Sequence, residues 1–556
     1  MSKKGFTLAE LLGVIALLGL ITIIAFPPLL SHIKKSSNTL DKATQDLIIA
    51  STSNYLEDNK SSFPKKEGNV YCITLETLVD SGKLSYDLKD NRGESLSLDK
   101  FIQIKVEDKK YNYIITDTCQ SSNYQEAILK GADPKLGSGM IAVTINDNGV
   151  VNKADVTKKW YSYEEKMWAN AVTVTEASRD KYMNAEAGTI IAEADILTYL
   201  VWIPRYKYRL WNVSNMADTG MDVSQKREIS IIFESKNSTK SLGNADGTYL
   251  THPAFTFGSE ELNGFWVGKF ETSKSGSSPN NSISANEARI KPNVQAWGNI
   301  QAANAFYTTR EMSKENNVFG LSEASDSHMM KNTEWGAVAY LSHSKYGINN
   351  EIRINNQVAY KTGCGATNEN AGTSSTCQIE YGKVTSYPQS TTGNISGIFD
   401  MSGGTWEYVM GVMLDSTNTS PVSGVNNLYN SGFNGKLTCP TCNEADGNDI
   451  SITEITEGLP WPDAKYYNTY KYNTGTKYWN RRILGDATGE MGPFNVSGSY
   501  SGSWYNDYAS FLYKSAPWFV RGGGNSRGIY AGIFFFGGVD GDLRDFRGFR
   551  VVLLDK

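Results

Sequence analysis

The stretch "GNISGIFDMSGGTWEYVMGV", at residues 393–412, carries the pattern that decides the fold of most of this chain. Its glycines permit tight turns, because glycine adopts backbone conformations that strain other residues. Phe399 and Trp406 supply large side chains that can fill a core between such turns. The stretch therefore predicts a turn-rich framework, and we expect its residues to serve structure before anything else.

Four other segments of similar texture occur in the same part of the chain: "GFWVGKFETS" (264–273), "NTEWGAVAYLSHSKYG" (332–347), "WFVRGG" (518–523) and "RGFRVVL" (547–553). With the first stretch, and in the same order, they resemble the motifs of the formylglycine-generating (sulfatase-modifying) family, a branch of the C-type-lectin-like folds. The resemblance spans about 200–556 and implies a large, loop-rich, C-type-lectin-like domain. It does not by itself imply an activity, because fold and function separate.

Several motif residues have an immediate structural interpretation. Glu334, Trp335, Val338, Ala339 and Leu341 fall at near-helical spacing with one apolar face. Arg521 and Arg550 are expected to be anchored by carbonyl or carboxylate oxygens, as buried guanidinium groups require.

Catalytic members of that family hold copper with two cysteines near the C-terminal motifs, and this chain departs from that pattern. No Cys follows Cys442, and no His follows His343. We therefore predict that the protein is not an enzyme and carries no metal or other cofactor. Calcium is the alternative, because "DGDLRD" (540–545) and "ADGNDIS" (445–451) cluster oxygen ligands, although neither has EF-hand spacing.

Six cysteines form three pairs of neighbours along the chain: Cys72 with Cys119, Cys364 with Cys377, and Cys439 with Cys442. An even count and local pairing predict disulfides formed in an oxidising compartment. Free thiols are the alternative. The "CPTC" of the last pair could also be half of a zinc site or a redox pair, but the four histidines stand at no ligand spacing.

The N-terminal "MSKKGFTLAELLGVIALLGLITIIAFPPLL" contains an apolar run long enough to cross a bilayer as a helix. Glu10 is the single charge in that run, and a carboxylate in hydrocarbon needs a partner. The segment resembles a type IV prepilin leader, cleaved between Gly5 and Phe6. The family pairs such a Glu with the methylated N-terminal amine of a neighbouring subunit, which implies pilin subunits and a prepilin peptidase as partners. An uncleaved membrane anchor is the alternative.

These observations predict an α+β fold with a long N-terminal pilin helix and a small β headpiece, followed by the lectin-like domain. The expected parts are a leader at 1–5, the helix at 6–58, the headpiece at 59–130, a linker at 131–160 and the large domain at 161–556. Within the headpiece, "FIQIKVEDKKYNYIITDTC" reads as a hairpin, because Ile102, Ile104 and Val106 alternate with polar residues.

The net charge and the aromatic content indicate which kind of ligand the protein could bind. The net charge is −5 and no basic stripe is present, which argues against a nucleic-acid ligand. The chain contains 31 Tyr and 12 Trp, side chains that favour binding surfaces. Aromatic packing in the core is the alternative interpretation.

The C-terminal segment differs from the rest of the chain in residue usage. Lys, Glu, Gln, Met and Trp are absent from 519–555, although together they make up nearly a fifth of the sequence. Randomising the two adenines of an Asn codon excludes these same five residues. The segment thus resembles the variable proteins of diversity-generating retroelements, whose lectin-like domains vary between "RGG" and "GFR" motifs; this places a variable region at 515–555. A fixed lectin-like tip that binds a ligand is the alternative.

Both interpretations predict one ligand-binding surface near the C-terminus, and the "WYND" at 504–507 and its neighbours could extend it through Tyr505, Asn506, Tyr508 and Tyr513. Its candidates are Asn525, Ser526, Arg527, Ile529, Tyr530, Phe534, Phe535, Phe536, Val539, Asp540, Asp542, Leu543, Arg544, Asp545, Phe546 and Arg547. About a third should face the core, because three consecutive Phe cannot all be exposed on a strand.

The sequence therefore predicts an adhesin or receptor-binding minor pilin. It would be anchored in the membrane, displayed on a type IV pilus or the cell surface, and bind a cell-surface, phage or host ligand, preferably a protein. A structural pseudopilin of secretion or DNA uptake is the first alternative, and a formylglycine-generating oxidase is the second.

Overall fold

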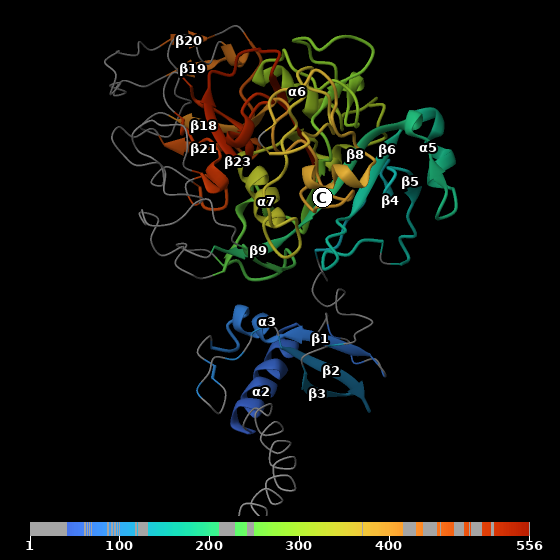
Figure 1. The fold of residues 1–556 in the computed structure, drawn as a ribbon, viewed down its shortest axis with the longest axis vertical. Helices are drawn as coiled ribbons and strands as arrows, with labels where there is room; N and C mark the ends of the chain where they lie inside the picture. Colours follow the sequence, from blue (N-terminus) through green and yellow to red (C-terminus); the bar gives the residue numbers. More distant parts are fainter. Residues whose placement is uncertain are drawn as a thin grey trace, which may run out of the picture. The chain divides into compact units, whose positions relative to one another are not determined.

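The computed structural model describes residues 42–119 and 132–554, with gaps inside both ranges. The longer gaps are 211–227, 242–248, 415–429, 438–452, 472–482 and 491–502. The chain divides into two compact units, Met1–Ala127 and Ile128–Lys556 (Figure 1). Each unit has its own hydrophobic core.

The first unit combines helices with a three-stranded antiparallel sheet. Its elements are α2 (Lys42–Asp58), β1 (Val70–Thr74), α3 (Leu75–Asp80), β2 (Phe101–Glu107) and β3 (Lys110–Thr116), with sheet order β1-β2-β3. The predicted hairpin is confirmed, and Asp108 and Lys109 form its two-residue turn with φ of 51° and 59°. The predicted Cys72–Cys119 disulfide is also present.

The prediction of a long pilin helix in an α+β fold was wrong. Strands outnumber helices among the described elements, and the longest described helix, α2, has 17 residues. The burial of α2 gives the physical reason. It buries Ile48, Ser51, Thr52 and Leu56, a short mixed face that suits packing on a small sheet. No continuous apolar stripe extends along it as a filament helix would need.

The predicted localisation, anchored in a membrane and displayed on a pilus or cell surface, is also corrected. Within the described ranges, no helix has both the length and the apolarity needed to cross a bilayer. The expected leader 1–5, the cleavage site at Gly5 and Phe6, and Glu10 lie outside the described residues, as does the part of the expected helix before Lys42.

An eight-stranded antiparallel sheet forms the centre of the second unit. Its order is β17 (His328–Met329), β25 (Val551–Leu553), β14 (Gly264–Gly268), β8 (Ile196–Pro204), β6 (Asn170–Val174), β4 (Ile141–Ile145), β5 (Val151–Lys153), β7 (Ile190–Ile191). Every residue of β6, β8 and β14 is buried, which means that other parts of the unit cover both faces of the sheet. The last described strand, β25, pairs with β14 on one edge and with β17 on the other, so it lies inside the sheet.

The segment expected to be a linker, 131–160, belongs to this sheet. Strands β4 and β5 lie within it and pair with β6 and β7, so the second unit begins before the predicted boundary at 161. The physical reason is long-range pairing: β4 and β5 form a local hairpin, which is marginal alone and joins the sheet only when β6 pairs with β4 and β7 pairs with β5.

A second sheet holds the C-terminal motifs and lies in the orange-to-red part of Figure 1. Its order is β21 (Asn468–Lys471), β18 (Trp406–Leu414), β22 (Trp518–Gly522), β23 (Gly532–Val539), and β24 (Arg547–Phe549) pairs with β18. The longer helices of this unit are α5 (Glu176–Met183), α6 (Ala302–Glu311) and α7 (Asn332–Ser342). Smaller ladders join β9 (Tyr206–Arg209) with β10 (Ser230–Phe233) and β11 (Leu250–Thr251), β12 (Thr256–Phe257) with β13 (Glu260–Glu261), β15 (Ser273–Lys274) with β16 (Ala288–Arg289), and β19 (Gly435–Leu437) with β20 (Thr453–Ile455).

The motif residues are structural, as the sequence predicted. Arg521 donates from Nη1 to the Asn332 side chain at 3.0 Å and from Nη2 to the Ile533 carbonyl at 3.3 Å. Arg550 forms a two-point ion pair with Glu407 and donates to the Gly268 carbonyl at 2.8 Å. Both guanidinium groups are fully buried. They fix the ends of β22 and β24, between which the candidate site lies.

Aromatic side chains fill much of this core. Six tryptophans, Trp202, Trp266, Trp297, Trp335, Trp504 and Trp518, are almost completely buried. The aromatic richness of the sequence therefore reflects core packing to a large extent, which favours the alternative interpretation of that signal.

Candidate functional site

The predicted C-terminal site residues divide into buried and accessible groups. Asn525, Phe534, Phe535, Phe536, Val539 and Arg547 are buried. Arg527, Asp540, Asp542 and Phe546 are half-buried, as are Tyr505, Asn506 and Tyr508, whereas Tyr513 lies outside the described residues. Ser526, Ile529, Tyr530, Leu543, Arg544 and Asp545 are exposed. The accessible positions therefore concentrate in two loops, 526–530 and 542–546.

The three consecutive phenylalanines all belong to the core. Phe534, Phe535 and Phe536 lie in β23, which pairs with β22 on one edge. The segment after Trp504 covers another part of the strand, because the Phe536 amide donates to the Tyr508 carbonyl at 3.1 Å. Phe534 packs on His343 and Trp504, whereas Phe535 packs on Trp406 and Tyr508. Both faces of the strand are thus covered.

Glycines at the end of β22 allow the 526–530 loop to form. Gly522 and Gly523 have φ of 78° and 74°, a left-handed backbone that other residues adopt only with strain. At Gly524 a Cβ atom would lie 2.4 Å from Nε1 of Trp406, so only glycine lets the loop approach that ring. Asn525 then fixes the loop, donating from Nδ2 to the Gln357 carbonyl at 3.0 Å.

Arg547 organises the 542–546 loop from its base. Its Nη1 donates to Asp540 at 2.9 Å and to the hydroxyl of Tyr408 at 3.1 Å, and it also pairs with Asp542. Burial raises the pKa of Asp542, and the neighbouring Asp540 carboxylate raises it further. Burial also opposes ionisation of Asp540, but hydrogen bonds from Asp542 and Arg547 bring its pKa below the usual value. These carboxylates therefore hold the loop in shape.

The exposed ends of the two loops meet an aromatic group. The Trp406 amide donates to the Phe546 carbonyl at 2.8 Å, and the Tyr508 amide donates to the Tyr530 carbonyl at 3.0 Å. The guanidinium carbon of Arg527 lies 4.8 Å from the ring centre of Trp406 and 5.6 Å from that of Tyr508. Side chains from β18, β23 and three loops thus gather in one place.

We define the recognition face as residues 358, 360, 406, 508, 526–530 and 542–546. Of the eleven large apolar side chains that are most exposed among the described residues, four lie on it: Val358 at 45%, Ile529 at 41%, Tyr530 at 42% and Leu543 at 40%. Asn525 connects Val358 to the 526–530 loop through Gln357, and the charge of Asp545, after burial, raises the pKa of Tyr360. Val358 is therefore tied to the 526–530 loop, and Tyr360 lies within electrostatic reach of the 542–546 loop.

Sequence reasoning missed three members of this face. Trp406 was assigned to the core because of its size, but it is half-exposed. Val358 and Tyr360 lie in "NNQVAYKTG", which carries no recognisable motif, so no sequence signal pointed to them.

No protein-family model matches this chain, and no curated protein matches it either.

The remaining predicted site features are placed as follows. The predicted Cys364–Cys377 disulfide is present, whereas Cys439, Cys442 and the acidic stretch 445–451 lie outside the described residues. Where the chain is described, no three His, Cys, Asp or Glu side chains gather as a metal site would require. In "DGDLRD", Arg547 is the partner of both Asp540 and Asp542.

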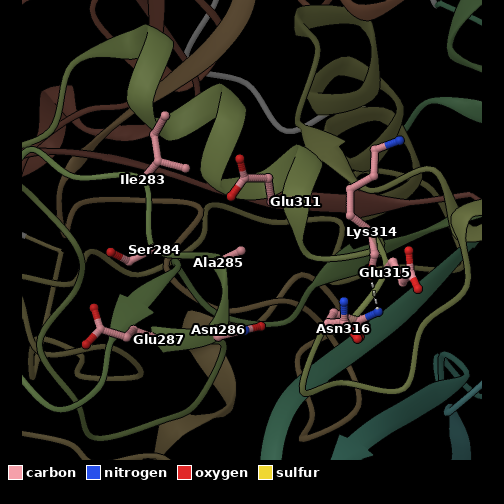
Figure 2. A pocket seen from close by; sticks show the side chains of 10 residues that line it. Ile283, Ser284, Ala285, Asn286, Glu287, Glu311, Lys314, Glu315 and Asn316 are labelled. Carbon is pink, nitrogen blue, oxygen red and sulfur yellow. Dashed lines mark hydrogen bonds between the residues drawn. The ribbon is translucent and has the colours of Figure 1, made fainter.

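A hollow of about 640 Å³ lies away from these residues, beside α6 (Figure 2). Two of the charged residues in its lining have partners outside it: Lys314 pairs with Glu323 at 3.0 Å, and Glu287 pairs with Lys274 at 3.1 Å. Figure 2 shows the Lys314 ammonium directed away from Glu287. A second hollow of about 430 Å³ lies between 148–151, 190–193 and 381–382. Neither contains a residue that the sequence singled out.

Proposed function

We propose that this protein is a non-catalytic binding protein that captures another protein through the recognition face. One observation carries the proposal: exposed Ile, Leu and Tyr side chains lie together with arginine on two loops, and Val358 is exposed beside them. Aromatic, aliphatic and arginine side chains at the centre of a patch are what protein interfaces use as energetic anchors.

The framework beneath the face supports the same proposal. Both loops start and end at buried, hydrogen-bonded residues, with Arg521 before the first and Arg550 after the second. Loops held in this way lose little conformational freedom when a partner binds, so more of the contact energy remains as affinity. A rigid base with exposed side chains suits recognition.

We also propose that the two loops vary among copies of this gene, through a diversity-generating retroelement. Burial alone accounts for part of the residue usage at 519–555, because β22 to β25 are largely buried and such strands avoid Lys, Glu and Gln. At the accessible loops 526–530 and 542–546, burial does not account for the absence of Lys, Glu and Gln. The proposal predicts a nearby near-copy of the last part of the gene that differs only at adenines.

The binding proposal predicts a large effect of removing the exposed apolar groups. The variant Ile529→Ser/Tyr530→Ala/Leu543→Ser should weaken partner binding by more than about 30-fold, because truncating a few anchors of an interface typically costs 2 kcal/mol or more. The partner is first identified by photo-crosslinking from position 530 to proteins of intact cells, phage particles and host cells. Its dissociation constant is then measured by biolayer interferometry.

A matched control removes equally exposed apolar groups elsewhere. Ile190 and Val384 are 62% and 60% exposed and lie outside the recognition face. Ile190→Ser/Val384→Ser should leave the dissociation constant unchanged. Equal losses in both variants, with unchanged melting temperatures, would show that the face is not the binding site. Conversion of a cysteine in a sulfatase-motif peptide to formylglycine would contradict the non-catalytic part of the proposal.

A further inference from the structure

Arg527 lies inside an aromatic enclosure on the recognition face. Trp406 and Tyr508 form its walls, at 4.8 Å and 5.6 Å from the guanidinium carbon. Phe535, fully buried, lies beneath, with its ring centre 5.7 Å from that of Trp406 and 5.4 Å from that of Tyr508. Phe546 packs edge-on against Trp406 at 5.8 Å. Two rings therefore flank one planar cation, and Phe535 and Phe546 pack against those two rings.

Aromatic rings hold the Arg527 guanidinium in place, and no polar group does so among the described residues. Arg521, Arg544, Arg547 and Arg550 each donate to oxygen acceptors. Among the described residues, by contrast, none accepts a hydrogen bond from the Arg527 guanidinium or forms an ion pair with it. Attraction between a cation and ring faces is modest where the cation keeps contact with water. Such a contact can be exchanged readily.

The enclosure is fixed, whereas its occupant sits on a loop tip. Trp406 belongs to β18, Phe535 belongs to β23, and Tyr508 is tied by its backbone to Tyr530 and Phe536. Trp406 and Tyr508 also precede the segment 519–555, whereas Arg527 lies inside it. The walls would therefore stay constant if the loop sequence changed.

We propose that this enclosure is a binding seat for an arginine of the protein partner, which Arg527 of the chain itself fills in the absence of that partner. The inference rests on the proposed function and names the side chain that the face recognises. The occupant seen here is a guanidinium, whose planar shape stacks on rings in a way that a lysine ammonium does not.

The seat can be tested without the partner, using N-acetylargininamide as the probe and saturation-transfer NMR on the full chain. Arg527→Ala should bind the probe about ten-fold more tightly than the unsubstituted protein, because an internal competitor has been removed. Arg544→Ala is the matched control, since Arg544 is an exposed arginine of the same face that pairs with Asp542 at 2.8 Å. It should bind the probe no better than the unsubstituted protein.

Wall substitutions complete the test. Arg527→Ala/Trp406→Leu and Arg527→Ala/Tyr508→Leu should lose the gained affinity while keeping the melting temperature of Arg527→Ala. The inference is overturned if Arg527→Ala gains nothing, if both wall variants still bind, or if tetramethylammonium binds as tightly as N-acetylargininamide. A seat that binds the probe while Ile529→Ser/Tyr530→Ala/Leu543→Ser keeps full partner affinity would refute the proposed function and leave the seat standing.

Discussion

Replacing Arg550 with Met should destabilise the second unit by about 3–5 kcal/mol, because removing one partner of a buried ion pair leaves the other charge uncompensated. Arg550 is fully buried and pairs with Glu407 through two contacts, at 2.9 Å and 2.5 Å. A folded domain is stable by about 5–15 kcal/mol, so this single loss removes much of the total. Urea denaturation followed by tryptophan fluorescence measures it.

The loss should be larger at high pH, because more than one carboxylate faces Arg550. Burial, and then the charges of Glu407 and Asp400, raise the pKa of Glu271 well above its usual value. Burial raises the pKa of Asp400 to about 6. Without Arg550 these groups can relieve their repulsion only by binding protons. Lowering the pH from 8 to 5 should therefore restore part of the stability of Arg550→Met.

Two controls separate the ion pair from side-chain volume. Arg544→Met removes an exposed arginine paired with Asp542 and should cost less than about 1 kcal/mol, as surface ion pairs do. Arg550→Met/Glu407→Gln removes both charges and should be more stable than Arg550→Met alone. A double variant that is less stable than the single one would show that the buried charge is not the cause.

The framework was the part of the fold that the sequence could predict. Arg521, Arg550 and the helical spacing of Glu334 and Trp335 each point to a local requirement, either a buried cation or one apolar helix face. The structure meets the first requirement through residues far away in sequence, such as Asn332 for Arg521, whereas α7 is buried on all sides and not on one face alone. The headpiece hairpin and two disulfides were also predictable, because their partners lie close together in the chain.

The errors arose where contacts between distant segments determine whether a residue is buried and which sheet a strand joins. An apolar run such as "IFFF" in β23 has the same appearance whether one or both faces are covered, and the covering segment 504–510 comes from elsewhere. In the same way, the β4–β5 hairpin is local, but its place in the large sheet depends on β6 and β7. Trp406 was predicted as core because size indicates burial on average, whereas its ring is half-exposed beside Arg527. Exposure at such a position depends on the neighbouring loop.

Glu490 connects the stability of the recognition face to pH. It is buried and accepts from the Tyr208 hydroxyl at 2.9 Å, from the Gly485 amide at 2.7 Å, and from the Tyr340 hydroxyl. The turn that it holds also supplies the Asp486 and Ala487 carbonyls that accept from Arg521. Since Arg521 fixes the start of the 526–530 loop, the charge state of Glu490 bears on the base of the binding surface.

The variant Glu490→Gln should gain stability relative to the unsubstituted protein as the pH rises. Burial raises the pKa of Glu490 from 4.5 to about 7, so the folded protein binds this proton more tightly than the unfolded chain. The stability that this proton contributes is complete below pH 4.5 and is lost as the pH rises through 7. Glutamine does not titrate. Between pH 5 and pH 8 the difference in unfolding free energy should therefore shift by about 2–3 kcal/mol in favour of the variant.

Measuring a difference between two proteins matters here, because His252 titrates in the opposite direction over part of this range. Burial lowers its pKa from 6.5 to about 3, so its contribution grows as the pH rises and masks that of Glu490 in either protein alone. The shared His252 term cancels when urea denaturation of both proteins is compared at each pH. Hydrogen exchange at the amides of residues 522–530 should show the same crossover if the turn controls the loop. A difference that stays constant from pH 5 to pH 8 would mean that Glu490 is ionised in the folded protein throughout, with its three hydrogen bonds outweighing its burial.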